Sequence, residues 1–393
     1  MISFDSALEI LSSNIPVFNF PEETLEVNNA FGRVIAKDQI SLLDLPSFDK
    51  AMMDGYAILG GDERAEYQLL EVVAAGQIAK ENLVSGTAIK IMTGAKIPSG
   101  TEKIIPIENT EEISGRVKIL SSHKSNNIAR RGEDVRVGNI ILKKGRRLNA
   151  EGIANLVASG ITKIKVFKKP KIIIISTGDE LVSNFADLKD GKIMDSNYPM
   201  LVALCKQYGL EVEKNILVKD DSTILTKILR EKTNTADLII LSAGVSAGDF
   251  DVVAKALSDA DFKIHFNRVA IKPGKPTTFA TKNNQLVFAL PGNPVAVFLT
   301  FHLFILHALN KFFKSVAFTP KQFSMPLGCD FKRKSTDRME YVPCTIQENG
   351  TLLPVKFHGS AHLAALLACD GFFVINKSVE EIKCGEQVKF IRI

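Results

Sequence analysis

Residues 171–176 form an almost wholly apolar run, KIIIIS, which is followed directly by polar residues. A strand that is apolar at every position must be covered on both faces, as in the parallel sheets of α/β domains. Extended and helical segments then alternate as far as residue 313, which indicates a doubly wound, mostly parallel α/β sheet. The other segments expected here are strands at 211–218, 238–242 and 263–269, a hairpin at 277–290, and helices at 196–208, 222–232, 252–257 and 294–313.

The sequence before residue 170 has a different pattern, in which helical pieces flank an extended region. Apolar residues at helical spacing follow Ser3, which can cap a first helix, and Asn149 can cap a second one that Gly160 ends. Between residues 41 and 140, short β-type runs alternate with glycine-containing turns, which is typical of an all-β module. The first domain is therefore expected to be discontinuous, with a β domain inserted into it.

After Pro320 the sequence is rich in extended segments again, and Asn349-Gly350 is a strong hairpin signal between two of them. The whole chain thus predicts a multi-domain α/β protein with four parts. They are a mixed, discontinuous N-terminal linker domain of residues 1–44 and 138–168, a β insertion domain of residues 45–137, an α/β domain of residues 169–316, and a β-barrel-like C-terminal domain of residues 317–393.

Composition excludes several classes of protein. Hydrophobic residues make up 46% and charged residues 24%, so wholesale disorder is excluded. A net charge of +5 does not by itself indicate nucleic-acid binding. The longest apolar stretch, 295–309, is shorter than the ~20 residues of a membrane span, so we expect a buried helix. Five widely spaced cysteines and no signal sequence predict reduced thiols in a cytoplasmic protein.

Polar loops follow the expected strands of the α/β domain. Because ligands of such sheets bind outside the carboxyl ends of the strands, these loops are expected to meet at one edge. Three loops are acidic and one carries two lysines, which suits a phosphorylated ligand with a divalent cation, while glycines let backbone N–H groups approach phosphate. The loops are Ser176–Glu180, Lys219–Ser222, Ser242–Asp251, Lys272–Pro276 and Pro291–Pro294.

Each loop also has a purely structural interpretation. The first can be an ordinary strand-to-helix turn, and the second can be a helix start in which Ser222 is the cap. Lys272 and Lys275 around Pro-Gly can form a solvated turn. In the insertion domain, residues 130–135 combine two arginines with two acids, and without context a surface salt-bridge turn is the favoured interpretation.

Eight segments in a fixed order carry a more specific signal than any single loop. They are 46–57 (PSFDKAMMDGYA), 91–100 (IMTGAKIPSG), 131–135 (RGEDV), 176–181 (STGDEL), 195–197 (DSN), 243–251 (AGVSAGDFD), 272–276 (KPGKP) and 290–294 (LPGNP). Together they resemble the molybdopterin molybdenumtransferases of molybdenum-cofactor synthesis, a family related to the E domain of gephyrin, over nearly the whole chain.

The resemblance implies an enzyme that takes adenylylated molybdopterin and molybdate, leaves molybdenum on the dithiolene and releases AMP. It implies Mg²⁺, a homodimer whose clefts are shared between subunits, small-molecule substrates, and a transient contact with the molybdopterin adenylyltransferase, with no nucleic acid and no membrane. The alternatives are an adenylyltransferase that makes adenylylated pterin from ATP, and a non-catalytic scaffold on the same fold.

The resemblance also implies roles for individual residues. The expected catalytic residues are Asp54, Glu180, Asp221, Asp251, Lys272 and Lys275. The expected metal ligands are Glu180, Asp221, Asp249 and Asp251. The expected substrate-binding residues are Thr93, Asp134, Thr177, Gly178, Gly244, Ser246, Gly248, Pro291, Gly292 and Pro294.

Two positions depart from the pattern of the family. Ala243 stands where the family usually has glycine, and alanine disfavours the positive φ that glycine allows. Pro343 replaces the arginine that ends a Gly-Arg-x-Glu-Phe-x-Arg motif in the last domain. A basic contact from that domain is therefore not expected at residue 343.

Overall fold

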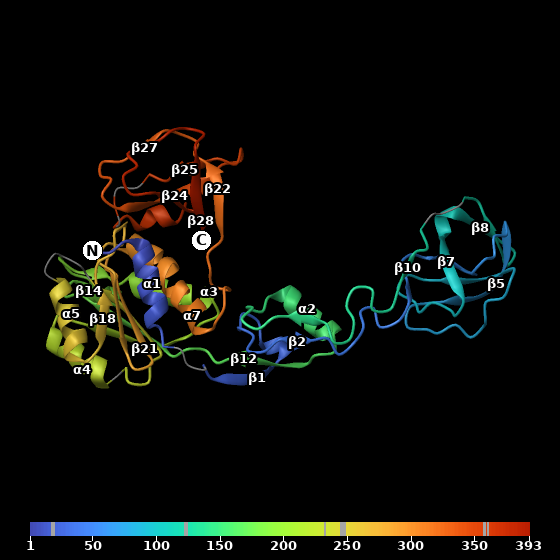
Figure 1. The fold of residues 1–393 in the computed structure, drawn as a ribbon, viewed down its shortest axis with the longest axis horizontal. Helices are drawn as coiled ribbons and strands as arrows, with labels where there is room; N and C mark the ends of the chain where they lie inside the picture. The colour runs from blue at the N-terminus through green and yellow to red at the C-terminus, as the bar shows by residue number, and fades with distance from the viewer. Residues whose placement is uncertain (17–19, 122–124, 232, 244–248, 357–358, 360) are drawn as a thin grey trace.

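The computed structural model describes residues 1–16, 20–121, 125–231, 233–243, 249–356, 359 and 361–393. The molecule is elongated (Figure 1), with the α/β and C-terminal domains at one end, the linker domain in the middle and the insertion domain at the other end. We keep these four domain names with the residue ranges given above, which remain predictions.

The α/β domain is built on a six-stranded sheet in the order β16-β13-β17-β21-β20-β18. The strands are β13 (Ile172–Thr177), β16 (Val212–Val218), β17 (Leu238–Ala243), β18 (Lys263–Phe266), β20 (Thr278–Lys282) and β21 (Gln285–Pro291). The first four strands in the sheet are parallel, whereas β20 runs antiparallel to both of its neighbours. The expected sheet is therefore present, with an antiparallel hairpin and edge strand added on one side.

The isoleucine run of β13 faces two hydrophobic cores. Ile172 and Ile174 belong to the core on one face of the sheet, and Ile173 and Ile175 belong to the core on the other. Helices α4 (Ser222–Glu231) and α5 (Asp249–Asp259) pack together on the second face. The first core is formed with α1 (Phe4–Asn14), α3 (Asn197–Gln207), α6 (Pro294–Thr300) and α7 (Leu306–Phe312). This arrangement confirms that β13 is covered on both sides.

The apolar segment 294–312 is helical throughout, but it is not one regular α-helix as expected. A π turn at Phe301–Ile305 separates α6 from α7. By length and composition the segment could cross a membrane, yet 83% of its most apolar window is buried inside the protein. Its side chains therefore form part of the α/β core.

Helix α1 differs from the expected domain assignment. Ser3 caps it by accepting a hydrogen bond from the Ser6 amide, as predicted. Its buried residues Ala7 and Leu11, however, join the core of the α/β domain, and the helix contacts α7 and β18. The first helix thus packs with the α/β domain, although it lies in the range 1–44 that was predicted for the linker domain.

The linker domain combines a small sheet with one helix. β1 (Glu22–Glu26) pairs with β12 (Lys163–Phe167), and α2 (Ala150–Ala158) is capped by Asn149 as expected. The chain leaves for the insertion domain along β2 (Gln39–Ile40) and β3 (Lys50–Ala51). It returns along β10 (Ile128–Ala129) and β11 (Ile140–Leu142), which pair with β3 and β2, so the two connections form one antiparallel ribbon.

The insertion domain is a six-stranded sheet in the order β7-β4-β6-β5-β9-β8, as the all-β prediction required. The strands are β4 (Gly55–Leu59), β5 (Glu66–Val73), β6 (Thr87–Ile91), β7 (Thr101–Pro106), β8 (Thr110–Ile113) and β9 (Arg116–Ile119). Separate hydrophobic clusters pack on its two faces, one around Ile89 and Ile91 and one around Tyr56 and Tyr67. It therefore has a core of its own.

The C-terminal domain adds a second sheet, in the order β19-β24-β26-β28-β22, with β25 paired to β24. The strands are β19 (Ile271–Lys272), β22 (Gln322–Pro326), β24 (Met339–Ile346), β25 (Leu352–Pro354), β26 (Gly371–Ile375) and β28 (Gln387–Arg392), and a two-stranded pair is formed by β23 (Phe331–Lys332) and β27 (Glu381–Ile382). The expected barrel is not closed among the described strands. Strand β19 comes from the α/β domain, so the two domains share a sheet.

Candidate functional site

The ends of the central strands lie in one row at the edge where a ligand site was predicted. Thr177 at the end of β13 is in register with Ala243 of β17, and Ala243 is in register with Pro291 of β21. Thr177 is also in register with Val218, which ends β16. The polar loops after these strands therefore start side by side.

A cavity of about 390 Å³ lies at this edge. Four of the predicted residues line it, namely Thr177, Glu180, Gly292 and Pro294. Two further lining residues, Ala361 and Leu363, come from the C-terminal domain, where Leu363 begins a short 3₁₀ helix that contacts α6. The site is therefore formed by two domains, a contribution that the strand pattern alone did not predict.

Asn197 is a site residue that sequence reasoning did not assign, although it belongs to the DSN segment. Its Nδ2 atom donates hydrogen bonds to Ser242 Oγ at 2.9 Å and to the Gly292 carbonyl at 2.6 Å. It thereby connects the start of α3 to the ends of β17 and β21. Asn197 is buried and lines the cavity, and within the described residues its Oδ1 atom has no hydrogen-bond partner.

The first loop turns sharply at Gly178. A Cβ atom at this position would lie 2.8 Å from Glu180 Oε2 and 2.9 Å from Leu181 Cγ, so a larger residue would displace the Glu180 carboxylate. The loop continues into β14 (Leu181–Val182), which pairs with β15 (Ile193–Met194). The acidic residue of the loop is thus placed at the cavity by a close backbone turn.

The second loop begins a helix, and the capping residue is Asp221 rather than Ser222 as expected. Asp221 Oδ1 accepts hydrogen bonds from the amides of Thr223 at 2.7 Å and Ile224 at 3.0 Å. These amides, Ile224 first, lower the pKa of Asp221. The prediction of Ser222 as the cap is wrong because Ser222 is already the first residue of α4. The N-cap is the residue before it, Asp221. Asp221 does not line the cavity, so its catalytic role is still only a prediction.

The third loop lies partly outside the described residues. Gly244, Ser246 and Gly248 belong to the segment 244–248, which the structure does not describe. Helix α5 begins at Asp249 and includes Asp251, but the description does not extend to the side chains of these two residues. The roles predicted for these five residues therefore stay predictions.

The fourth loop connects the α/β domain to the C-terminal domain, and neither of its lysines lines the cavity. Lys272 Nζ lies 2.8 Å from Glu340 Oε1, and the two residues are in register where β19 and β24 pair. The Glu340 side chain is only 11% exposed, and its other carboxylate oxygen lies 3.9 Å from the buried Arg333. Arg333 is itself fixed by donating to three backbone carbonyls. Glu340 thus holds Lys272 between two domains.

The second lysine of this loop is arranged differently. Lys275 is exposed, and it forms no ion pair within the part of the chain that the structure describes. Gly274 between the lysines has a φ of +117°, and a Cβ atom there would lie 2.8 Å from both Ile271 and Thr300. The close packing of this turn favours glycine, and it leaves the charge of Lys275 available for an anion.

The insertion domain carries a separate pair of predicted residues. Asp54 Oδ1 accepts hydrogen bonds from the amide and the hydroxyl of Thr93, both at 2.7 Å. The Thr93 amide, followed by its hydroxyl, lowers the pKa of Asp54. Asp54 stands just before β4 and Thr93 just after β6, which are neighbours in the sheet. The structure therefore brings these two predicted residues together, and their roles in the reaction stay predictions.

The loop 130–135 is largely the salt-bridge turn that was the favoured interpretation without context. Arg130 pairs with Asp49 at 2.7 Å, and Arg131 pairs with Asp44 at 2.7 Å. Asp134 is exposed, and its amide donates to the Leu45 carbonyl. Among the described residues, no hydrogen bond joins Asp134 to Asp54 or Thr93.

The two groups of candidate residues lie at opposite ends of the molecule. In Figure 1, β14, which follows Glu180, is at one end of the molecule, and β7 of the insertion sheet is at the other. Glu180 and Asp54 therefore do not share a site within one chain.

Carboxylate oxygens are suitable ligands for Mg²⁺, so the chemistry of the predicted donors fits this ion. In the described residues, however, no three histidine, cysteine or acidic side chains gather where a metal could be held. Mg²⁺ commonly binds through one or two carboxylates together with substrate phosphates and water. Glu180 at the cavity fits that mode, in which a substrate supplies the remaining ligands.

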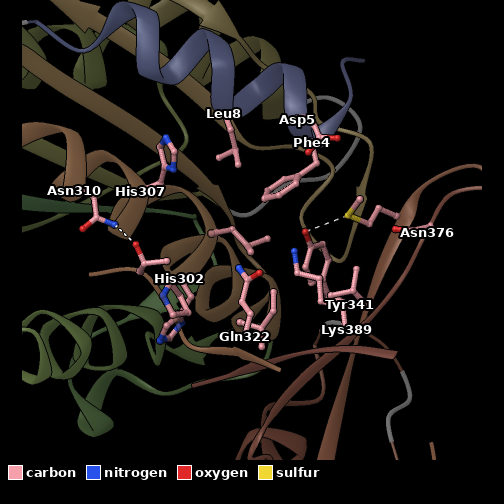
Figure 2. Close-up of a pocket in the computed structure, with 16 residues that line it drawn as sticks. Phe4, Asp5, Leu8, His302, His307, Asn310, Gln322, Tyr341, Asn376 and Lys389 are labelled. Carbon is pink, nitrogen blue, oxygen red and sulfur yellow. Dashed lines mark hydrogen bonds between the residues drawn. The ribbon is translucent and has the colours of Figure 1, made fainter. Parts of the chain in front are cut away.

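A second cavity, of about 250 Å³, lies away from the strand ends, between α1, the π turn and the C-terminal sheet. Figure 2 shows Phe4 and Leu8 descending into it from α1, with Tyr341 of β24 opposite them. His302 of the π turn borders this cavity and is buried, and its burial lowers its pKa to about 4. This cavity contains none of the predicted site residues.

Three family models together match most of the chain. The "MoeA N-terminal region (domain I and II)" matches residues 2–160, the "Probable molybdopterin binding domain" matches residues 173–311, and the "MoeA C-terminal region (domain IV)" matches residues 325–393. The first match spans the insertion domain and both parts of the linker domain up to residue 160.

Individual proteins match over the full length. A molybdopterin molybdenumtransferase of Staphylococcus epidermidis is 32% identical, with 99% of this chain and 95% of the relative covered. One from Staphylococcus aureus is 31% identical, with 95% and 91% covered. The crystal structure of the molybdopterin biosynthesis moeA protein from Pyrococcus horikoshii has a TM-score of 0.84 at 31% identity, and it covers both chains completely.

Proposed function

Because the chain belongs to the molybdopterin molybdenumtransferase family, an enzyme family of molybdenum cofactor biosynthesis that inserts molybdenum, we propose that the strand-end cavity is where this reaction takes place. The substrates are adenylylated molybdopterin and molybdate. The observation that carries this proposal is the register of Thr177, Ala243 and Pro291 at one sheet edge, where Thr177, Glu180 and Asn197 line a cavity.

The residues of the cavity and the two lysines of the fourth loop, which do not line it, have separate tasks in this proposal. The loop amides and Lys275 stabilise the negative charge of the phosphoric anhydride and of molybdate, since fixed donors and cations act where charge develops. Asn197 offers a buried acceptor to an N–H group of the ligand. Lys272 is oriented by Glu340. A water molecule attacks the adenylyl phosphorus, so that the anhydride bond breaks and AMP and the pterin phosphate separate. The two dithiolene thiols then replace two oxygens of molybdate, which leave as water with protons from the thiols and from solvent, and molybdenum keeps its oxidation state.

Mg²⁺ is part of the proposal as a bound ion that Glu180 holds together with substrate phosphate oxygens. When bound, it neutralises charge on the anhydride and makes AMP a better leaving group. Asp221, Asp249 and Asp251 are further candidates for its ligands.

We further propose that the active enzyme is a cytoplasmic homodimer in which Asp54 and Thr93 of one subunit face the strand-end cavity of the other. The insertion domain, with Asp54 and Thr93, and the α/β domain, with the cavity, lie at opposite ends of one molecule, which supports this arrangement (Figure 1). Exposed apolar side chains on and next to the linker domain, Ile40, Leu42, Ile140 and Val157, offer a surface for a second copy. A transient contact with the adenylyltransferase that supplies the substrate belongs to the same proposal.

The test is a turnover assay with adenylylated molybdopterin, with and without molybdate, that measures AMP release and molybdenum bound to pterin. We expect both products to appear together only when molybdate is present. Consumption of ATP with metal-free pterin and no molybdate would favour the adenylyltransferase alternative instead. A protein inactive in both assays, yet folded, would favour the scaffold alternative.

A further inference from the structure

A cluster of basic residues surrounds a hollow of about 540 Å³ at the joint between the linker domain and the α/β domain. We call it the joint pocket, and define it by Lys143, Lys144, Arg146, Arg147, Lys314 and Val316. It is separate from the strand-end cavity and from the cavity at α1, with which it shares no lining residue.

The two sides of the joint pocket are held in close contact. A Cβ atom at Gly145 would lie 2.9 Å from the Lys314 carbonyl, and the Ser315 hydroxyl donates a hydrogen bond to the Gly145 carbonyl. The turn 143–146 of the linker domain therefore packs directly on the segment that follows α7. This contact brings basic side chains from two distant parts of the chain around one hollow.

The charges of the joint pocket are not neutralised by the protein. None of its five basic side chains forms an ion pair within the described residues. The nearby Asp38 accepts a hydrogen bond from the Lys144 amide, so it contacts the backbone and not the ammonium group. Lys144 Nζ lies over the Phe167 ring, 5.4 Å from its centroid, which leaves its charge without a carboxylate partner. Surface cations of ordinary proteins are usually interspersed with acids, so five cations without acidic partners near one hollow create a positive potential.

Arg147 is the most unusual of these cations. Its guanidinium donates to the carbonyls of Gly32 and Gln207 and lies over the ring of Tyr208, 5.7 Å from the centroid. The guanidinium is partly buried, which lowers its pKa, and within the described residues no carboxylate pairs with it. A bound anion would supply the missing counter-charge.

We propose that the joint pocket binds a small polyanion of the polyphosphate class, either inorganic or the phosphate chain of a nucleotide. Lysine and arginine are the side chains that bind phosphate groups, and a hollow of this volume is in the size range of small-molecule sites. Val316, which is 82% exposed, and Ala317 offer an apolar wall to a nucleotide base. Because the pocket spans two domains, its ligand would also hold them together.

The test measures binding by isothermal titration calorimetry at low salt and without Mg²⁺, with inorganic triphosphate, ATP, AMP and a poly-aspartate peptide as probes. The variants are Lys143→Ala/Lys144→Ala/Lys314→Ala and a control of equal charge change, Lys80→Ala/Lys118→Ala/Lys227→Ala, whose lysines are exposed and outside the pocket. Both are also made in a Lys272→Ala/Lys275→Ala background, so that binding at the strand ends is removed. Arg147 is kept, because it supports the joint.

We expect triphosphate to bind to the background protein and to the control, and to bind at least about tenfold more weakly to the joint-pocket variant, which is ~1.4 kcal/mol. Tighter binding of ATP than of triphosphate would assign the site to nucleotides, and equal binding would assign it to the phosphate chain alone. Melting curves must show that all variants fold.

Three outcomes would overturn the proposal. They are the absence of triphosphate binding to the background protein, equal weakening in the control variant, and binding of a poly-aspartate peptide but not of triphosphate. The second outcome would mean that only the net charge matters, and the third that the pocket is a contact for an acidic protein segment.

Discussion

Asp54 in the insertion domain and Lys272 in the α/β domain each contact one side chain that holds them in place. The partner of Asp54 belongs to the same domain, whereas the partner of Lys272 belongs to another domain. Thr93, which binds Asp54, follows an adjacent strand of the same small sheet. Glu340, which binds Lys272, belongs to another domain and lies 68 positions further along the chain. The insertion side can therefore be formed locally, whereas the α/β side depends on the C-terminal domain.

The prediction with the largest expected effect tests whether the insertion domain and the strand-end cavity form the two halves of one active site. Asp54→Asn and Glu180→Gln should each lower molybdenum insertion ~100-fold or more, the scale for losing a group that acts on the reacting atoms. If the halves come from different subunits, unfolding and refolding the two variants together makes half of the dimers mixed. Each mixed dimer has one intact cleft of two, so about a quarter of the wild-type activity should return.

The control for this experiment is each variant refolded alone, with differently tagged subunits to confirm that mixed dimers have formed. Mixed dimers without recovered activity would contradict the shared cleft and would leave Asp54 without a role at the strand ends.

The second prediction concerns stability at the α/β end, where His302 is buried and neutral. Its pKa is about 4 in the folded protein because of burial, against an ordinary value near 6.5. The stabilisation is complete above pH 6.5 and is lost as the pH falls toward 4, because only the unfolded chain binds the proton there. The loss is about 3 kcal/mol, or roughly three-hundredfold in the folding equilibrium.

Urea denaturation of wild type and His302→Leu between pH 4 and pH 7 measures this effect. The variant should lack most of this dependence on pH. His307, which is half-buried and bonded to Ser12, serves as the matched comparison, and His307→Leu should flatten the dependence less. Parallel curves for wild type and His302→Leu would contradict the assignment.

The third prediction tests the support that the C-terminal domain gives to Lys272. Glu340→Gln should reduce activity ~10-fold, as is common when a partner that orients a functional group is lost. The reduction should appear mainly in the KM for the anionic substrate, and Glu340→Asp should restore part of it. Glu380→Gln breaks an exposed ion pair with Lys332 in the same domain and should have no comparable effect.

The fourth prediction, with the smallest expected effect, tests the hydrogen bonds that Thr93 donates to Asp54. Thr93→Val removes the hydroxyl but keeps the amide, which is the stronger cause of the lowered pKa. Activity should fall a few-fold at most, and the acid limb of its pH profile should move to higher pH as the pKa of Asp54 rises. Thr93→Ser keeps the hydroxyl and should leave the profile unchanged, whereas equal shifts in both variants would contradict this explanation.

Local patterns in the sequence predicted the frame of the molecule because they reflect short-range physics. The isoleucine run of β13 required a sheet covered on both faces, and the capping of α1 and α2 by Ser3 and Asn149 followed from single residues. The family and its reaction were also predicted, from the order of eight short segments, and the comparisons confirm them.

Contacts between distant segments could not be predicted in the same way. Nothing near Lys272 in the sequence points to Glu340, because the ion pair depends on how two domains share a sheet. Asn197 was present in a recognised segment, but its hydrogen bonds to Ser242 and Gly292 appear only when three elements meet. Whether Asp221 or Ser222 caps α4 depends on where the helix starts, and a difference of one residue decides it.

The connection to the insertion domain has a mechanical consequence. The outgoing and returning segments pair at β2 with β11, at Leu45 with Val135, and at β3 with β10, so the tether is a two-stranded band. A connection made of one extended segment allows rotation about its axis. A connection made of two paired segments can bend perpendicular to its plane but resists twisting. We therefore expect the insertion domain to tilt toward or away from the strand-end cavity of the other subunit without turning Asp54 and Thr93 away from it. An opening and closing movement along one direction would then suffice to admit substrate and release product.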